Sequence, residues 1–201
     1  MTAYKIIGIA GTNGSGKDTV GQLLMQEHKY LFVSGSDMLR NELKKQKKPL
    51  TRENTRLLSS EWRRQYGLGI MIDKAREVFI SLGGEQSYNG LAIASLRSPA
   101  EADRVHEYGG IVIWLDADPK VRYERIRENA SSRGSDRAVV DNVSFSDFIA
   151  DEMIEMGQPN SNDPTTLSMS AVKAKSDKVL VNEGNNLQLL SVNLNQLLGF
   201  S

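Results

Sequence analysis

Short apolar runs recur along the chain, and each is separated from the next by a segment of helical length. The runs are rich in Ile, Val and Leu and lack strict polar–apolar alternation, a pattern typical of strands covered on both faces. We expect strands at 4–10, 30–33, 91–94, 111–115 and 178–181. The order of these segments predicts an α/β fold with a mostly parallel sheet.

The segments between the apolar runs carry helix signals. Pro119 suits the first turn of a helix, and Thr51 and Ser144 suit N-cap positions. The expected helices are 17–27, 36–45, 51–66, 70–81, 99–108, 119–128, 144–156 and 187–198.

Two stretches interrupt the regular alternation of strands and helices. The stretch between the second and third apolar runs holds two or three helices, more than the dozen or so residues of a plain crossover. Residues 129–143 are polar, contain Arg133 and Arg137 and have little to bury, so they resemble a surface flap. Residues 158–167 form a further polar loop.

Composition narrows the class of protein. With 201 residues, 39% of them hydrophobic, the chain can bury one sizeable core, so we expect a single domain over 1–201. Lys plus Arg and Asp plus Glu number 25 each, so there is no global basic field and no nucleic-acid partner is expected. The absence of Cys excludes disulfides and thiolate chemistry. The first apolar run is too short to span a membrane, and we expect a cytoplasmic monomer or homodimer.

The strongest chemical signal follows the first predicted strand. The sequence Gly11-Thr12-Asn13-Gly14-Ser15-Gly16-Lys17 fits the pattern G-x-x-x-x-G-K and precedes an amphipathic helix. Glycines let backbone N–H groups turn inward around phosphates, the helix N-terminus adds partial positive charge, and Lys17 reaches the β and γ phosphates. A glycine-rich turn with a chance lysine is the alternative, but strand, spacing and helix together favour ATP binding.

The residue after this lysine departs from the usual Ser or Thr. Asp18 occupies that position, and the hydroxyl follows at Thr19. Mg²⁺ prefers hard oxygen ligands and keeps several waters, so Asp18 and Thr19 are candidate metal ligands. Alternatively, Asp18 only favours the helix N-terminus electrostatically.

Several segments resemble small P-loop kinases. Residues 34–40, Ser-Gly-Ser-Asp-Met-Leu-Arg, resemble the segment that follows the second strand of adenylate kinase, and the Lys-x-Thr end of the loop is similar too. Residues 91–103 resemble the third-strand segment of kinases related to dephospho-CoA kinase. Residues 113–125, 145–149 and 178–184 are similar to later parts of that group.

This resemblance implies a nucleoside-monophosphate-kinase-like fold. It has three layers, a five-stranded parallel sheet, a helical acceptor-binding insertion at 36–88 and a lid at 129–143. By position, Asp37 and Arg40 would border the acceptor pocket, Arg97 would pair with the acceptor's phosphate, and Arg133 and Arg137 would close over ATP. Guanidinium groups suit such roles because they match phosphate oxygens bidentately.

One departure from the resemblance concerns the end of the third strand. Relatives commonly carry an acid there, whereas this chain has Ala94 followed by Ser95. The missing carboxylate is supplied by Asp18, Asp37 or Asp116, or phosphoryl transfer is weak.

The expected activity is ATP-dependent phosphorylation of a nucleoside or deoxynucleoside monophosphate. Catalysis would rest on positioning and electrostatics, with Lys17, Arg97, Arg133 and Arg137 neutralising charge; Asp37 is the candidate base if the acceptor is a hydroxyl. The alternatives are a dephospho-CoA-type kinase and a regulatory or RNA-associated P-loop ATPase.

Other basic residues have simpler explanations. Arg122 is expected on a solvated, self-paired helix face, while Arg125 and Arg127 leave structural and functional roles equally open. The lysines at 44, 45, 47 and 48 are expected to be a solvated cluster rather than a site for a phosphorylated tail.

Overall fold

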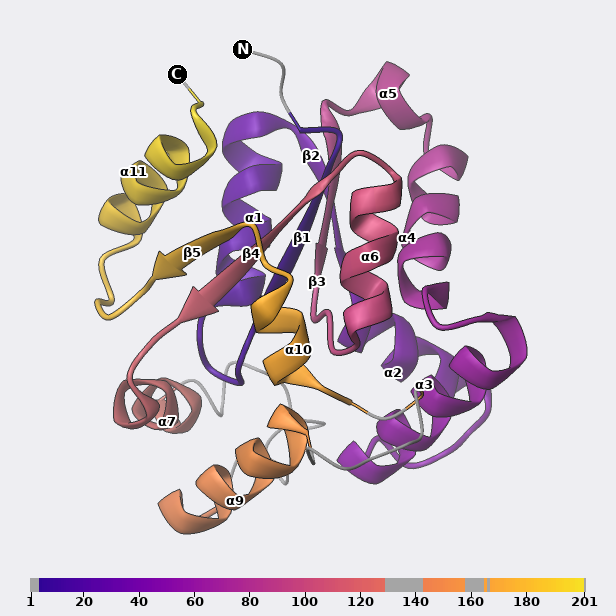
Figure 1. The fold of residues 1–201 in the computed structure, drawn as a ribbon, viewed down its shortest axis with the longest axis vertical. Coiled ribbons are helices and arrows are strands. Elements are labelled where there is room, and N and C mark those ends of the chain that lie inside the picture. The colour runs from indigo at the N-terminus through magenta and orange to yellow at the C-terminus, as the bar shows by residue number, and fades with distance from the viewer. Residues whose placement is uncertain (1–3, 129–142, 158–164, 166, 201) are drawn as a thin grey trace.

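Five parallel strands form the centre of the structure (Figure 1). The computed structural model describes residues 4–128, 143–157, 165 and 167–200. The sheet order is β2-β3-β1-β4-β5, and every neighbouring pair is parallel. The strands are β1 (Ile6–Gly11), β2 (Tyr30–Ser34), β3 (Gly90–Ala94), β4 (Ile111–Asp116) and β5 (Lys178–Val181). The predicted five-stranded α/β fold is therefore confirmed.

The helices begin and end close to the predicted positions. Thr51 and Ser144 each accept a hydrogen bond at an N-cap, from the backbone N–H groups of Asn54 and Asp147. Two short helices, at 84–87 and 169–174, were not predicted. The helices are α1 (Lys17–His28), α2 (Gly35–Lys45), α3 (Arg52–Tyr66), α4 (Ile70–Ser81), α5 (Gly84–Ser87), α6 (Pro99–Glu107), α7 (Pro119–Glu128), α9 (Phe145–Met156), α10 (Met169–Ala174) and α11 (Leu187–Leu198).

Helices cover both faces of the sheet, which gives three layers. Ile7 and Ile9 of β1 point into a core that α1 and α11 complete. Ile6 and Ala10 point to the other face, where α4, α6 and α10 pack. This alternation follows from the period of two along a strand, and burial on both faces explains the uninterrupted apolar runs.

The helical stretch between β2 and β3 has a small core of its own. Leu39 and Leu43 of α2 pack with Leu58 of α3 and with Ile70 and Met71 at the start of α4. The remainder of α4 packs against the sheet. The helices α2 and α3 thus stand beside the sheet while anchored to it through α4, and they lie near the carboxyl ends of the strands (Figure 1). The acceptor-binding role of 36–88 stays a prediction.

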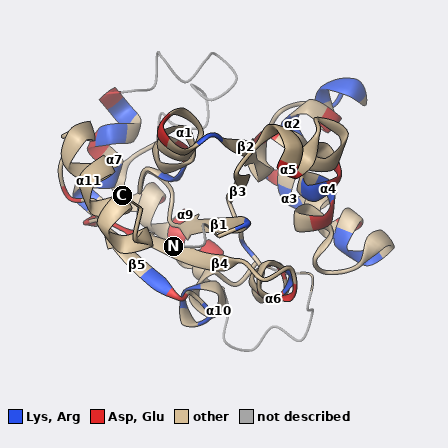
Figure 2. Cartoon of the chain, turned by 90° about the horizontal axis from the view of Figure 1, so that it is seen from above, with Lys and Arg blue, Asp and Glu red and all other residues tan. Residues whose placement is uncertain are grey.

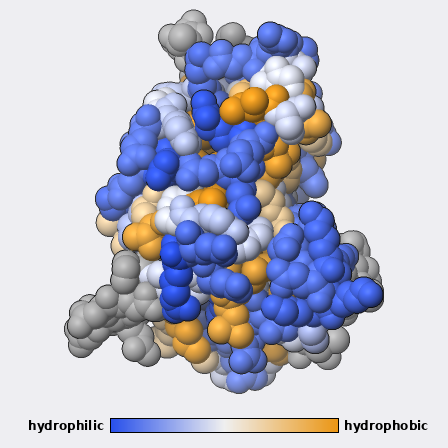
Figure 3. Space-filling model, turned by 90° about the vertical axis from the view of Figure 1, so that its right-hand side faces the viewer, coloured by the Kyte–Doolittle hydropathy of each residue, from blue (hydrophilic) through white to orange (hydrophobic). Residues whose placement is uncertain are grey.

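On the side viewed in Figure 3, hydrophobic residues occur in separate small patches and form no extended apolar face. Basic and acidic segments are intermixed over the helices (Figure 2). In the described residues, no helix has both the length and the hydropathy that a membrane span requires. The predicted lid with Arg133 and Arg137 lies outside the described residues, apart from Val143.

Candidate functional site

The glycine-rich loop lies where β1 ends and α1 begins, at the carboxyl edge of the parallel sheet. Gly14 has φ 79°, and a Cβ there would lie 2.6 Å from the carbonyl oxygen of Arg122. Gly16 has φ 101°, and a Cβ there would lie 2.5 Å from Nδ2 of Asn182, whose amide donates to the carbonyl oxygen of Ser15. Glycine is favoured at both positions because φ lies in the left-handed region, and at Gly14 the backbone of α7 also leaves no room for a Cβ.

Two hydroxyl groups of the loop are buried without a hydrogen-bond partner among the described residues. They belong to Thr12 and Ser15. Buried polar groups in proteins almost always have a hydrogen-bond partner. Two buried hydroxyl groups without one, in a glycine loop, therefore indicate a position for a ligand that accepts hydrogen bonds. The loop therefore fits the phosphate chain of ATP, next to the positive end of α1.

The ammonium group of Lys17 lies in surroundings that favour the binding of an anion. Its Nζ donates to the carbonyl oxygen of Thr12 at 2.6 Å. Desolvation by burial, followed by the nearby charge of Arg97, lowers the pKa of Lys17 from its ordinary value of 10.5 to about 8, and Asp18 and Glu155 oppose this shift only in part. The surroundings of Lys17 thus lack the negative charge that a triphosphate would bring.

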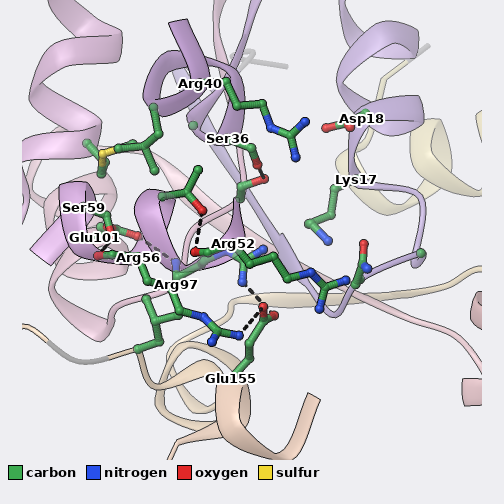
Figure 4. Close-up of a pocket in the computed structure, with 18 of the residues that line it drawn as sticks. Lys17, Asp18, Ser36, Arg40, Arg52, Arg56, Ser59, Arg97, Glu101 and Glu155 are labelled. Atoms are coloured by element: carbon green, nitrogen blue, oxygen red, sulfur yellow. Dashed lines mark hydrogen bonds and ion pairs between the residues drawn. The ribbon is translucent and has the colours of Figure 1, made fainter. Parts of the chain in front are cut away.

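The candidate metal ligands, Asp18 and Thr19, both line the cavity beside the loop. No group of three His, Cys, Asp or Glu side chains able to hold a metal exists within the described residues. Mg²⁺ at this position would be held by Asp18 and Thr19 together with phosphate oxygens and water, which is the usual way proteins bind this ion. The residues present fit that mode. Figure 4 shows the Asp18 carboxylate and the Arg40 guanidinium pointing toward one another.

A cavity of about 520 Å³ runs from the phosphate loop to the helical insertion. Lys17 and Asp18 lie on one side of it, and Arg56 and Arg97 on the other (Figure 4). The residues that line the far side come from α2, α3, the turn after β3, the first turn of α6, and α9. They include Ser36, Arg40, Arg52, Arg56, Ser59, Arg63, Ser95, Arg97, Glu101 and Glu155. The structure thus brings the predicted residues Arg40 and Arg97 to one cavity with the phosphate loop.

The side chain of Arg97 is held by α9. Its Nη1 lies 2.6 Å from Oε2 of Glu155, and Arg56 Nη2 lies 3.8 Å from Oε1 of the same carboxylate. One turn earlier on α9, Asp151 pairs with Arg52. Sequence reasoning missed Arg52, Arg56 and Glu155. Spacing was the available signal. Arg52 and Arg56 are four residues apart, as are Asp151 and Glu155, which places each pair on one face of its own helix.

The backbone of Arg97 is held by Glu101. Oε2 of Glu101 accepts from the backbone N–H groups of Arg97 at 2.7 Å and Ser98 at 3.2 Å. Oε1 accepts from Arg63 of α3 at 2.8 Å. Glu101 thereby connects the helical insertion to the turn that presents Arg97.

The expectation for Arg122 is wrong. The residue is 3% exposed, not on a solvated face. Its guanidinium donates to the carbonyl oxygens of Ala117 and Asn13 and pairs with Glu152 of α9. The helix α7 packs against the phosphate loop, so this side chain is enclosed and fixes the loop from behind.

The three candidates for the missing carboxylate lie in different places. Asp18 lines the cavity. Asp37 is exposed on α2 and is not among the residues that line the cavity, and Asp116 pairs with Lys173 at 2.9 Å. At the end of β3, Ala94 is buried in the core and Ser95, with φ 75°, faces the cavity instead. The functional role of Asp37 stays a prediction.

Solved structures, a shikimate kinase among them, share this fold. Shikimate kinase from Bacteroides thetaiotaomicron is 14% identical, with a TM-score of 0.57, and the match covers 98% of this chain and 99% of that one. The protein TT1252 from Thermus thermophilus is 17% identical, with a TM-score of 0.55, and 99% of each chain is covered. At these identities the likeness concerns the fold alone.

Sequence relatives extend over nearly the whole chain. The UPF0200 protein MMP1282 of Methanococcus maripaludis is 27% identical over 192 residues, which cover 93% of this chain and 92% of the relative. A UPF0200 protein of Sulfurisphaera tokodaii is 29% identical over 186 residues, covering 91% and 90%. A family model described as an AAA domain matches residues 7–146, the phosphate loop included. This match spans well over half of the chain, which therefore belongs to the AAA domain family and has the fold of the small P-loop kinases.

Proposed function

We propose that the chain is an ATP-dependent kinase that phosphorylates a nucleoside monophosphate or a similar nucleotide-like acceptor. One observation carries the proposal: a single cavity has a phosphate-binding loop on one side and guanidinium groups on the other. A group transferred between two anionic substrates needs cations at both ends of its path.

The loop side of the cavity suits the donor. When bound there, ATP supplies the γ-phosphoryl group and Mg²⁺ neutralises charge on the β and γ phosphates. Lys17 would stabilise charge that develops during transfer, and Asp18 and Thr19 would hold the metal ion together with phosphate oxygens. Arg133 and Arg137 would act from the ATP side, as the resemblance implies.

The carboxylates of the cavity favour a phosphate as acceptor. In the described part of the chain, those that line the cavity are Asp18, Glu101 and Glu155. Glu101 is occupied by Arg63 and backbone N–H groups, and Glu155 by Arg97. A hydroxyl acceptor needs a general base, whereas a phosphate oxygen does not. This arrangement therefore supports a phosphate acceptor more than a sugar alcohol.

The guanidinium groups give the acceptor its orientation. Arg40 from α2 and Arg97 from the turn after β3 reach the cavity from different elements. Two guanidinium groups that approach from different directions fix the orientation of an anionic acceptor in the cavity. Glu101 keeps the Arg97 backbone in place while this happens.

A coupled assay of ADP formation tests the proposal. The acceptors are the common ribo- and deoxyribonucleoside monophosphates, dephospho-CoA and shikimate, with Lys17→Ala as the inactive control. We expect turnover with at least one nucleoside monophosphate. Turnover with dephospho-CoA alone would favour the second kinase type. Acceptor-independent ATP hydrolysis, stimulated by RNA or protein, would contradict the kinase assignment.

A further inference from the structure

Glu155 occupies a position in the cavity that an anionic ligand could take. Its carboxylate receives Arg97 at 2.6 Å through one oxygen and faces Arg56 at 3.8 Å through the other. The three side chains come from α9, the turn after β3, and α3, and they meet at one point of the cavity (Figure 4). A carboxylate between guanidinium groups has the same chemistry as a phosphate oxygen pair between them.

The ionisation of Glu155 depends on these arginines. Burial alone would favour the neutral acid, but Arg97, Arg52 and Arg56 outweigh it and hold the pKa of Glu155 below its ordinary value. Side chains here are not sealed from water, since Arg97 remains 30% and Arg56 34% exposed. Glu155 is therefore a charged group held mainly by its partners, and a ligand that satisfies the same partners can replace it.

The cluster has more guanidinium groups than carboxylates. Arg52, Arg56 and Arg97 face two acids, Asp151 and Glu155. Exchange of Glu155 for a phosphomonoester dianion would add one negative charge and balance the three cations. A neutral ligand would leave the arginines unpaired if it displaced Glu155, so it gains nothing from the exchange.

We propose that Arg52, Arg56 and Arg97 form the subsite for the acceptor's phosphate and that Glu155 is its resident counter-ion, which the acceptor displaces. The identification of the ligand as an acceptor rests on the proposed kinase function. The anion site itself rests on the arginine cluster and can be tested without turnover.

Every anion that enters the subsite must displace Glu155, and this displacement makes its free energy of binding less favourable. Replacing the carboxylate by a neutral amide removes this cost and leaves the guanidinium groups without their counter-ion. Anion affinity should then increase. If Glu155 instead served only to hold the arginines in position, the same substitution would decrease anion affinity.

The test is calorimetric titration with inorganic phosphate while Mg²⁺ and a non-hydrolysable ATP analogue fill the phosphate loop. In Glu155→Gln we expect phosphate to bind about tenfold more tightly than in the wild type, the order expected for one charge-assisted hydrogen bond. In Arg56→Met we expect binding about tenfold weaker. Affinity for the ATP analogue should stay unchanged in Arg56→Met. Asp147→Asn, an exposed acid of the same helix, controls for net charge and should leave phosphate binding unchanged.

For any acceptor that is phosphorylated, KM should be lower in Glu155→Gln than in the wild type and higher in Arg56→Met. Thermal unfolding of each variant verifies that it is folded. Weaker phosphate binding in Glu155→Gln, or unchanged binding in folded Arg56→Met, would overturn the subsite. If phosphate binding responds as expected but no acceptor is phosphorylated, the anion site stands and the kinase function does not.

Discussion

The Arg63 guanidinium and the Glu101 carboxylate form an ion pair at 2.8 Å in which the side chains are only 2% and 1% exposed. Arg63 belongs to α3 of the helical insertion, and Glu101 belongs to α6, which packs on the sheet. The same carboxylate accepts from the backbone N–H groups of Arg97 and Ser98. The pair therefore connects the insertion to the turn that presents an arginine to the cavity.

Removal of either partner should destabilise the protein strongly. Arg63→Met or Glu101→Gln leaves the other group buried without its counter-charge, and we expect each to lower the free energy of unfolding by about 3–5 kcal/mol. The double variant should lose less than the sum of the two. Urea denaturation measures all three. The exposed pair Lys5–Glu85 is the control, because Lys5→Met should cost at most about 1 kcal/mol. Equal losses in both pairs would contradict the prediction.

The architecture was predictable because strands covered on both faces leave continuous apolar runs. The run at 111–115 becomes β4, in which Val112, Ile113, Trp114 and Leu115 are all buried. The helix α10 was missed because six residues are less than two helical turns and carry no readable periodicity. Met169 and Val172 nevertheless bury themselves against the sheet.

The site was predictable only where its functional residues are contiguous in the sequence. The phosphate loop was predictable because its glycines, the start of the helix and Lys17 occur in one short segment. Arg122 carries no such local pattern, and the four-residue spacing of Asp151 and Glu155 does not reveal their partners, which are distant in sequence and meet them only through folding. An arginine on a solvated helix face and an arginine enclosed behind the phosphate loop have the same local sequence pattern, so sequence alone cannot separate them.

The lowered pKa of Lys17 predicts that ATP binding weakens at alkaline pH. The free protein loses the Lys17 proton near pH 8 instead of 10.5, and the charged form binds the phosphates. The Kd for ATP should therefore rise above about pH 8, by up to tenfold per pH unit, until the pKa of the complex is reached. Fluorescence titration at constant ionic strength measures the profile. Lys17→Arg should lack this bend, and a wild-type profile flat to pH 10 would contradict the assignment.

The same shift predicts an opposite effect on the stability of the ligand-free protein. Between about pH 8 and 10.5 the unfolded chain keeps a proton on Lys17 that the folded chain has released. The free energy of unfolding should therefore rise with pH in this window through this residue. The difference between wild type and Lys17→Met, followed by urea denaturation across the window, isolates the contribution. A difference that decreases with pH would be inconsistent with the lowered pKa.

Gly14 and Gly109 provide a matched pair for the loop. Both have positive φ, 79° and 71°, but a Cβ on Gly14 would lie 2.6 Å from the Arg122 carbonyl oxygen, whereas a Cβ on Gly109 would have no neighbour within 4 Å. Gly109→Ala should cost about 1–2 kcal/mol of stability from its backbone conformation alone and leave ATP affinity unchanged. Gly14→Ala should lose more stability and weaken ATP binding at least about tenfold, since the loop must move. Similar ATP affinity in the two variants would contradict the proposed contact.

Arg122 holds the phosphate loop from behind through three partners at once. Its Nε donates to the Ala117 carbonyl oxygen at 2.9 Å, its Nη1 to that of Asn13 at 3.2 Å, and its fork pairs with Glu152, with Nη2 at 2.9 Å from Oε1. A lysine keeps the charge but cannot reach three acceptors in a fixed plane. We expect Arg122→Lys to raise the Kd for ATP about fivefold to tenfold, an increase equivalent to about one charge-assisted hydrogen bond.

The control for this change is Arg127→Lys on the same helix. Arg127 is exposed and lies over the ring of Tyr123, and within the described residues it makes no hydrogen bond to the phosphate loop. Its substitution should leave ATP affinity unchanged. If both variants bind ATP like the wild type, the loop keeps its conformation without Arg122, and the packing of Gly14 against α7 alone is sufficient to hold it.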